Sequence, residues 1–352
     1  MTGGATEQRA AQWRVLDLSG VRVSGVWACL PKRSEDNFAR CVALYGDERK
    51  AAGVVKATGI AKRRVADAGV SSLDLCMAAA RGLLDDCGAA PDDIRAVVCV
   101  TFTPERQMPC NACQAQSLLG LPQSVAALDI NLACSGWPYG LYVAGLMAKA
   151  MGGRVLLLDG DVQTARVDPA DGATVPVLAD AGTATLVEPA PHCDGRPWRF
   201  SFMTDGANGD ALALPFGGVM SMDGFGVFKF ATLDVLDFIN CFMESVAAAP
   251  DDFDAFVPHQ ANVYMVRQIA KRLGFAAERT WISGDEFGNS ASASVPVTIA
   301  HCAGRLPRSD RRLLAAGFGG GLSASVCDMD LPGDCSLGVV DYEGASGREG
   351  AR

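Results

Sequence analysis

The chain has 352 residues, 49% of them hydrophobic and 20% charged, and its formal net charge is −9. These values are typical of a folded globular protein with two similar units or one large α/β body, and they exclude a mostly disordered chain. No run reaches the roughly 18 to 20 apolar residues of a membrane span, so we expect a cytoplasmic protein without a membrane partner. The acidic balance excludes a nucleic-acid partner bound through its phosphates, because such binding requires a basic surface.

The numbers of cysteines and histidines bear on metal sites and disulfides. There are 13 cysteines at irregular spacing and 3 histidines, and the CxxC pair Cys110 and Cys113 has no second pair beside it. Zinc sites and disulfide frameworks need paired or regularly spaced ligands. We therefore expect reduced thiols, most of them buried, and no metal.

Helix and strand patterns alternate along the first half of the chain. Ser71–Ser72 can cap a helix, and the apolar positions that follow predict one that ends at Gly88. Continuous apolar runs at 96–100 and 155–158 are typical of strands buried on both faces, and 178–187 is a further strand-like region. This alternation favours an α/β fold.

The segment 188–199 contains three prolines and a glycine and is predicted to link two halves of the molecule. The same alternation then resumes, with predicted helices at 232–248 and 262–273 and predicted strands at 253–257, 313–316 and 326–331. Beyond Gly333 the chain is rich in Gly, Ser and charged residues. We expect an N-terminal half at 1–190, a C-terminal half at 191–335 and a flexible tail at 336–352.

One cysteine stands apart because of its local pattern, Asp129-Ile-Asn-Leu-Ala-Cys-Ser-Gly-Trp137. A short apolar strand is predicted to end at Ala133, and an apolar helix begins just after Cys134. A thiol at a helix N-terminus meets the positive end of the helix dipole and free backbone N–H groups, and both stabilise the thiolate. The arrangement is mechanically similar to a nucleophile elbow. From this segment alone, Cys134 is either a nucleophile or one more packed thiol.

Two further segments place polar side chains where a strand ends or a helix begins. In Phe253-Asp-Ala-Phe-Val-Pro-His-Gln-Ala-Asn262 a predicted strand delivers His259 to its end, where catalytic groups are common. By itself His259 fits an ordinary loop histidine better. In Phe287-Gly-Asn-Ser-Ala-Ser-Ala-Ser-Val-Pro296, Asn289 either supplies a left-handed turn or donates a hydrogen bond to a developing oxyanion.

The fourth segment is Ala316-Gly-Phe-Gly-Gly-Gly-Leu322, between two predicted strands. It matches neither the GxGxxG pattern nor a P-loop, because no Lys follows the glycines. The segment therefore favours close approach of the backbone to a ligand over phosphate binding.

In their residues and in their order along the chain, these four segments resemble the ketosynthase III branch of the thiolase-fold condensing enzymes. That branch comprises β-ketoacyl-acyl-carrier-protein synthase III and its relatives. The resemblance spans most of the chain and rests on Ala133-Cys134-Ser135-Gly136, Val257-Pro258-His259-Gln260-Ala261-Asn262, Gly288-Asn289-Ser290 and Gly317-Phe318-Gly319-Gly320-Gly321. It implies an α/β, thiolase-like fold in which two pseudo-repeated halves form a five-layered αβαβα body. It also implies a homodimer.

The resemblance gives each matching residue an expected role. Cys134 carries an acyl group as a thioester, and His259 and Asn289 bind the thioester carbonyl of a malonyl-type second substrate. Loss of CO₂ from that substrate creates an enolate, whose charge two hydrogen-bond donors stabilise. The N–H groups of Cys134 and Gly320 form the oxyanion hole for attack on the acyl thioester, and Phe318 packs near the thiol. Neither a metal nor an organic cofactor is required.

The resemblance also implies partners that deliver substrates, namely an acyl carrier protein or CoA thioesters. Arg267, Lys271 and Arg272 form a basic helix edge that is expected, together with Lys229, to dock the carrier protein. A plain solvated helix face has the same spacing. Met108 matches a position that gates the acyl pocket from across the dimer.

Departures from the family pattern concern the acyl donor. The family's usual CoA binders have a Trp and an Arg before the word Thr58-Gly59-Ile60, whereas 51–57 in this chain offers Lys56 as the nearby base. Another phosphate-binding Arg is shifted by one place, at Arg166. The donor is therefore expected to ride on a carrier protein or to bind as CoA in a different way. Met108, where Phe is frequent, favours a longer or odd-shaped acyl chain.

Two other functions stay open at this point. The enzyme could move the acyl group from Cys134 to a hydroxyl, amine or carrier thiol without decarboxylation, and Asn289 would then be dispensable. The chain could instead be a non-catalytic scaffold subunit with a vestigial site, which the retention of all three polar groups disfavours. We expect a decarboxylative condensing enzyme of fatty-acid-like or secondary-metabolite biosynthesis.

Overall fold

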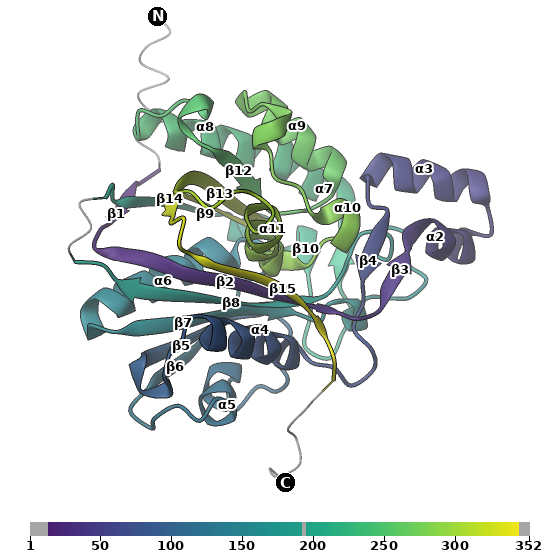
Figure 1. Ribbon diagram of the computed structural model, residues 1–352. Helices are drawn as coiled ribbons and strands as arrows, with labels where there is room; N and C mark the ends of the chain where they lie inside the picture. Colours follow the sequence, from purple (N-terminus) through teal and green to yellow (C-terminus); the bar gives the residue numbers. More distant parts are fainter. Residues whose placement is uncertain (1–12, 192–194, 345–352) are drawn as a thin grey trace, which may run out of the picture.

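A computed structural model describes residues 13–191 and 195–344, which form two large sheets with helices outside and between them (Figure 1). The six-stranded sheet has the order β15-β2-β8-β7-β5-β6, with bounds β2 Val21–Pro31, β5 Ile94–Val100, β6 Ala126–Ile130, β7 Arg154–Asp161, β8 Ala181–Pro189 and β15 Ser336–Tyr342. The five-stranded sheet has the order β1-β9-β14-β13-β12, with bounds β1 Leu16–Leu18, β9 Trp198–Thr204, β12 Ala255–Pro258, β13 Arg311–Gly319 and β14 Ser323–Leu331. Both sheets mix parallel and antiparallel pairs.

The larger helices fill three layers, with bounds α4 Ser72–Asp86, α5 Asn111–Leu118, α6 Gly136–Met151, α8 Val235–Ser245, α9 Val263–Leu273 and α11 Ser294–Ala303. α4 and α5 cover the outer face of the six-stranded sheet, and α8 and α9 cover the outer face of the five-stranded sheet (Figure 1). α6 and α11 lie between the sheets and contact both. The expected αβαβα body is therefore confirmed.

Smaller elements lie around this body, with bounds α2 Asn37–Tyr45, α3 Glu48–Thr58, α7 Gly224–Lys229, α10 Gly284–Phe287, β3 Ser34–Asp36, β4 Lys62–Arg64, β10 Leu212–Ala213 and β11 Ser221–Met222. β3 pairs with β4, and β10 pairs with β11. α2 and α3 project from one side of the molecule (Figure 1). None of the helices within 13–191 and 195–344 is long and apolar enough to cross a membrane.

The predicted helix after Ser71 forms as α4 because its ends are capped. The side chain of Ser71 accepts a hydrogen bond from the N–H of Asp74, and the Asp74 carboxylate accepts one from the N–H of Ser71, which completes a capping box. Gly88 follows the helix with a φ of 57°. A side chain there would be strained, so glycine at this position favours termination of the helix.

Glycine also sets how closely α6 lies against the six-stranded sheet. A Cβ atom at Gly140 would lie 2.7 Å from side-chain carbons of both Leu157 and Val100. Trp137 and Leu141 on the same helix are fully buried in the central core. Because α6 is seated so tightly, its N-terminal end, with Cys134 just before it, has a fixed position between the two sheets.

The prediction of a flexible tail at 336–352 is wrong for residues 336–342. They form β15, which pairs in parallel with β2, and Trp27 Nε1 donates to Ser336 Oγ at 2.8 Å. Residues 345–352 lie outside the described part of the chain. β1 likewise joins the sheet of the other half, so each half of the chain lends one strand to the opposite sheet.

Candidate active site

One cavity of about 810 Å³ collects side chains from four separate turns. Five residues predicted for the site line it: Cys134, His259, Asn289, Phe318 and Gly320. They come from the β6–α6 turn, the end of β12, the turn before α11, and the end of β13 with its connection to β14. The four sequence segments therefore converge on one space.

The β6–α6 turn holds Cys134 against the five-stranded sheet. Ser135 Oγ lies 2.7 Å from Ser323 Oγ, and Ser325 Oγ donates to the Ser135 carbonyl at 2.7 Å. A Cβ atom at Gly317 would lie 2.6 Å from the carbonyl oxygen of Cys134. The prediction for the glycine-rich loop was close approach to a ligand; at Gly317 the close neighbour is instead the backbone of the cysteine turn.

The electrostatic surroundings of Cys134 act in two directions. Burial raises the pKa of the Cys134 thiol to about 12, and nearby Asp161 adds to the rise. Hydrogen bonds from the backbone N–H groups of Cys134 and Gly320 lower that pKa. The dipole of α6, which begins at Gly136, acts in the same direction as these donors. Negative charge on the sulfur therefore meets N–H donors from both halves of the chain.

His259 follows β12 and is 2% exposed. Its Nδ1 lies 2.8 Å from Ser294 Oγ and 3.0 Å from the Ala291 carbonyl oxygen. The Gln260 N–H donates to Ser294 Oγ at 3.1 Å, so the Ser294 hydroxyl proton is available to Nδ1. A proton on Nε2 lets Nδ1 accept from that hydroxyl, whereas the Ala291 carbonyl, which only accepts, favours a proton on Nδ1. The ring of Phe318 stands nearly perpendicular to the imidazole, with ring centres 5.4 Å apart.

Protonation of His259 is expected to destabilise the fold as the pH falls below 6.5. Burial lowers the pKa of His259 from 6.5 to about 4, so between these values the unfolded chain takes up a proton that the folded chain refuses. The stabilising contribution is fully present above pH 6.5 and falls by on the order of 3 kcal/mol by pH 4. Urea unfolding of the wild type and His259→Gln, at neutral and at acidic pH, measures this difference.

The comparison with His259→Gln is needed because the stability contribution of a second buried group, Asp161, changes with pH in the opposite direction. Burial raises the pKa of Asp161 from 3.8 to about 7, so its contribution to stability declines as the pH rises through that range. Asp161 is present in both proteins, and its effect cancels in the difference. An equal loss of stability on acidification in wild type and His259→Gln would contradict the assignment of a neutral, buried imidazole.

Asn289 is fixed by its backbone and keeps donor capacity in its side chain. Its N–H donates to the Val177 carbonyl at 3.0 Å, and its carbonyl accepts from the Ala179 N–H at 2.7 Å. The side-chain Oδ1 accepts from the Ala291 N–H at 2.9 Å, and Nδ2 makes a long contact of 3.4 Å to the Ala261 carbonyl. An amide carries two N–H groups, so at least one remains for a ligand in the cavity.

The other predicted site residues lie outside this cavity. Met108 is 85% exposed and does not line the cavity of its own chain; its predicted place was the cavity of a partner subunit. Lys229 ends α7, and Arg267, Lys271 and Arg272 lie on α9; all four are exposed. These residues therefore lie on the surface of the molecule and do not line the cavity that holds Cys134.

Much of the cavity wall comes from a segment that no sequence motif marked. The lining side chains from it are Leu212, Leu214, Pro215, Phe216, Met220, Met222, Val227 and Phe228. Their sequence signal is apolar residues among glycines and prolines without helical or strand periodicity, which is typical of a loop. The structure instead folds parts of this segment into β10, β11 and α7, and a local pattern of this kind does not reveal that the segment faces a cavity. No sequence pattern marked Gln163, which also lines the cavity, because a single polar residue after a strand does not reveal what it faces.

Comparison with known proteins relates both halves of the chain to one family. A family model described as 3-oxoacyl-[acyl-carrier-protein (ACP)] synthase III matches residues 128–206, and its C-terminal counterpart matches 243–328. The first range contains Cys134, and the second contains His259 and Asn289.

Relatives match over most of their length. A curated relative from Streptomyces coelicolor, Beta-ketoacyl-[acyl-carrier-protein] synthase III 2, is 34% identical over 310 residues, which are 87% of this chain and 92% of the relative. A 3-oxoacyl-(acyl-carrier protein) synthase from Burkholderia xenovorans has a TM-score of 0.88 and 32% identity, covering 94% of this chain and 99% of its own. The priming β-ketosynthase of a polyketide pathway has a TM-score of 0.81 and 27% identity, covering 91% and 98%.

Proposed function

The chain belongs to the 3-oxoacyl-[acyl-carrier-protein] synthase III family, and on this basis we propose that it condenses a Cys134-bound acyl group with a malonyl-type thioester. The reaction is a decarboxylative Claisen condensation, which makes the protein a transferase and yields a β-ketoacyl thioester. The observation that carries the proposal is the convergence of Cys134, His259, Asn289 and Gly320 on one cavity.

In the first half-reaction the Cys134 thiolate attacks the carbonyl carbon of the acyl donor. A C–S bond forms to Cys134, the C–S bond to the donor's carrier breaks, and the departing thiolate takes the proton that Cys134 gave up. The N–H groups of Cys134 and Gly320, which already lower the pKa of the thiol, donate to the oxyanion of the tetrahedral intermediate.

In the second half-reaction the malonyl-type thioester binds with its carbonyl oxygen at Asn289 Nδ2 and at His259 Nε2, which carries the imidazole proton in this complex. Its C–C bond to the carboxylate breaks, CO₂ leaves, and the two donors stabilise the enolate oxygen. The enolate carbon attacks the acyl thioester, a new C–C bond forms, and the Cys134 thiolate is released. No atom changes oxidation state through an external redox partner, so the reaction requires neither a metal nor an organic cofactor.

Release of CO₂ separates this proposal from a transferase that does not decarboxylate. Purified protein would be offered a panel of acyl donors together with malonyl-carrier protein, and CO₂ and β-ketoacyl product would be measured. We expect both to appear in equal amounts. Acylation of Cys134 without any CO₂ release would overturn the proposal in favour of transfer to a hydroxyl, amine or thiol.

The acyl donor is proposed to arrive on a carrier protein, with CoA thioesters as the other source. Segment 51–57, where the sequence differs from the family's usual CoA binders, lies in α3. Among the described residues no side chain of α3 lines the cavity, whereas Arg166 does. We propose a cytoplasmic homodimer in which Met108 reaches the partner's cavity. Its 85% exposure in the single chain supports that placement.

Carrier docking is proposed at α9, because this helix begins at the cavity. Asn262 and Met265 at its start line the cavity, while Arg267 and Lys271 lie exposed further along it. Lys229 ends α7, whose Phe228 also lines the cavity. A basic surface beside the opening attracts an acidic carrier and aligns its thioester arm.

Reversing two of these charges is expected to weaken carrier binding without changing the chemistry. The double variant Arg267→Glu with Lys271→Glu should raise KM for malonyl-carrier protein about tenfold and leave kcat unchanged, since exposed charges act on encounter. Arg272 is left intact because its side chain also donates to the Thr232 carbonyl at 2.5 Å. Steady-state kinetics at low and high salt measure the effect, which salt should shrink.

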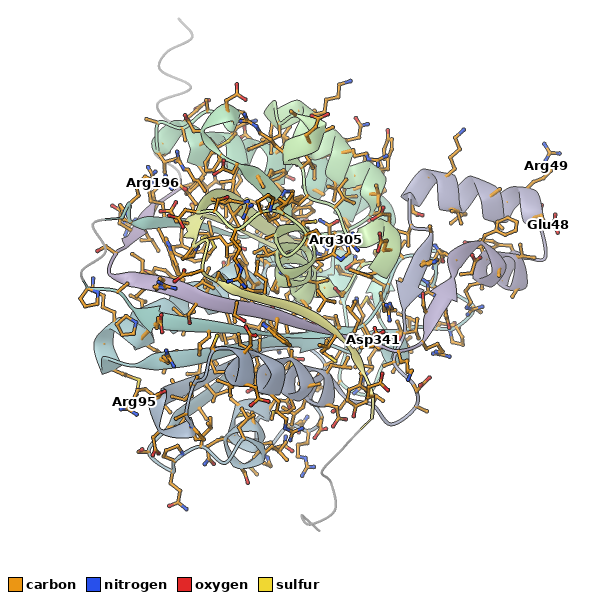
Figure 2. The ribbon with its side chains drawn as sticks, in the orientation of Figure 1. Glu48, Arg49, Arg95, Arg196, Arg305 and Asp341 are labelled. Carbon is orange, nitrogen blue, oxygen red and sulfur yellow. The ribbon has the colours of Figure 1, made fainter. Side chains whose placement is uncertain are left out.

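The matched control is Arg95→Glu with Lys149→Glu, which reverses two exposed charges elsewhere. Arg95 donates to the Asp92 carbonyl only three residues away, whereas the Arg272 bond joins residues 40 apart. Arg95 lies at the opposite end of the molecule from the α8–α9 layer (Figure 2). The control should keep the wild-type KM. Equal increases in both double variants would point to net charge, and an unchanged KM in the α9 variant would remove α9 from the docking surface.

A further inference from the structure

Gln163 borders the cavity but takes no part in the mechanism above. Its side chain is 2% exposed, and its Nε2 donates to two backbone carbonyls, that of Asn289 at 2.7 Å and that of Ala179 at 2.9 Å. Because both partners are acceptors only, the amide nitrogen must face them. We propose that Gln163 is a positioning residue that holds Asn289 for decarboxylation, an inference that rests on the proposed function.

Gln163 is the one side chain among the hydrogen-bond partners of Asn289 described above; the other partners are backbone groups. The N–H of Asn289 donates to the Val177 carbonyl, and its carbonyl accepts from the Ala179 N–H. Leu178 and Asn289 form an isolated parallel bridge. A single bridge is a short stretch of strand pairing. The Gln163 amide bonds the carbonyls of both paired segments, at Ala179 and at Asn289, and so helps to fix the distance between the two segments. The separation in turn sets where Asn289 Nδ2 lies in the cavity.

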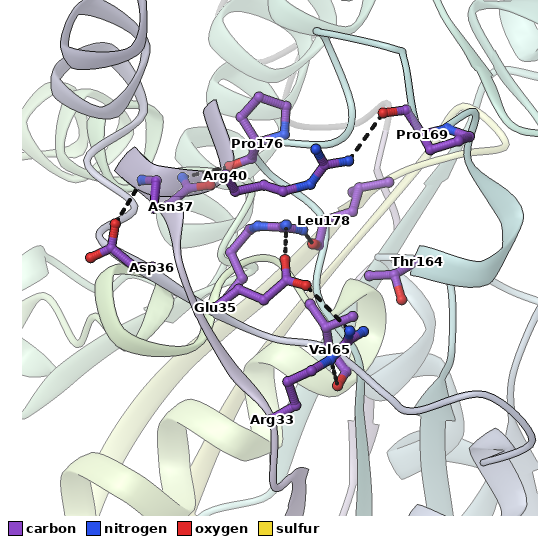
Figure 3. A network of polar contacts seen from close by, with 12 residues as sticks. Arg33, Glu35, Asp36, Asn37, Arg40, Val65, Thr164, Pro169, Pro176 and Leu178 are labelled. Carbon is purple, nitrogen blue, oxygen red and sulfur yellow. Dashed lines mark hydrogen bonds and ion pairs between the residues drawn. The ribbon is translucent and has the colours of Figure 1, made fainter. Parts of the chain in front are cut away.

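The segments on both sides of Gln163 are held by further hydrogen bonds of their own. Arg63, which is 4% exposed, donates to the Leu178 carbonyl at 2.6 Å and to Glu35 at 2.6 Å, and Figure 3 shows Glu35 and Leu178 within this polar network. On the Gln163 side, the Asp180 carboxylate accepts from the N–H of Thr164 at 2.9 Å. Loss of the Gln163 amide therefore removes one support of Asn289, while Asn289 keeps its bonds to Val177 and Ala179 and the surrounding residues keep theirs.

The two half-reactions depend on the Gln163 amide to different degrees. Asn289 acts only in the second half-reaction, and a misplacement of about 1 Å costs on the order of 100-fold in rate. Cys134 is held through Ser135, Ser323 and Ser325, none of which contacts Gln163 in the hydrogen bonds of the described residues. Acylation of Cys134 should therefore be insensitive to Gln163.

Gln163→Met tests the inference, because methionine keeps the length of the side chain and removes the donor. We expect CO₂ release from malonyl thioester to slow by about 10-fold to 100-fold, with acylation of Cys134 unchanged. In the Asn289→Ala background, Gln163→Met should have no additional effect, since residues that act as a unit are not additive. Gln116→Met is the matched control, because Gln116 Nε2 also donates to a backbone carbonyl, that of Leu121, outside the cavity.

Three results would overturn the inference: wild-type CO₂ release in Gln163→Met, equal slowing of acylation and CO₂ release, or an undiminished effect in the Asn289→Ala background. If Gln163→Met does not fold, Gln163→Leu, which is apolar and has no donor in any protonation state, takes the same tests. Failure of the proposed function is recognised separately. In that case Asn289→Ala itself would release CO₂ at the wild-type rate.

Discussion

Cys134→Ser is expected to eliminate acyl-enzyme formation and to lower condensation at least about 10³-fold. The hydroxyl fits the space of the thiol, so the cavity keeps its shape. A serine hydroxyl is far less acidic than a thiol, and the N–H donors and helix dipole that favour thiolate are too weak to create an alkoxide. His259 does not replace them as a base, because burial lowers its pKa to about 4. Intact-mass spectrometry after incubation with acyl donors, together with turnover rates, measures both effects.

The control for this substitution is Cys113→Ser, an exposed cysteine outside the cavity. It should gain one acyl group as the wild type does and turn over normally. Cys134→Ser should still bind malonyl thioester and slowly release CO₂, since His259 and Asn289 remain. Wild-type acylation of Cys134→Ser, or peptide mapping that places the acyl group on another cysteine, would remove Cys134 from the mechanism.

Asn289→Asp is expected to slow CO₂ release by about 10²-fold to 10³-fold while Cys134 is still acylated. The substitution changes no volume, and one carboxylate oxygen can still accept from the Ala291 N–H as Asn289 Oδ1 does at 2.9 Å. The other oxygen replaces the Nδ2 donor and faces the oxygen on which enolate charge develops. Repulsion replaces stabilisation in the second half-reaction only. Labelled CO₂ release and acyl-enzyme mass, followed in the same sample, separate the two steps.

Asn240→Asp makes the same chemical change on α8, outside the cavity, and should leave both steps unaltered. Unfolding by urea shows whether either variant is simply less stable. If Asn289→Asp decarboxylates like the wild type, the enolate is stabilised by other groups. If it loses acylation as well, Asn289 shapes the cavity as a whole rather than one of the two half-reactions.

Sequence patterns were most informative where the physics is local. The cap at Ser71, the start of α6 just after Cys134 and the strand that delivers His259 depend on neighbours within a few residues, and they form as predicted. The strand before Cys134 was predicted to end at Ala133, whereas β6 ends at Ile130. The predicted single helix at 232–248 instead begins earlier, as α7, and passes through a π-helical turn at Phe230–Asp234 before α8. Periodicity marks the apolar face of such a segment but does not fix where the winding changes.

The predicted tail shows why long-range pairing escaped the sequence. Its Gly, Ser and charged residues are typical of a frayed end, yet Ser336 Oγ donates to Asp86 at 2.5 Å and Arg64 bonds Asp341 at 2.7 Å. These partners are more than 200 residues away along the chain, as are those of the β2 pairing. An edge strand of mixed composition becomes recognisable only when the strand beside it is known.

The same division applies to the cavity. The sequence by itself determined the reactive groups of Cys134, His259 and Asn289, because residue type sets the chemistry and local turns set which end of an element each one occupies. Only the tertiary structure decided that they meet, that Gly317 must lack a side chain beside the cysteine turn, and that Gln163 clamps Asn289. Those features depend on contacts between segments far apart in the chain, whose spacing is set by how two sheets pack on α6 and α11.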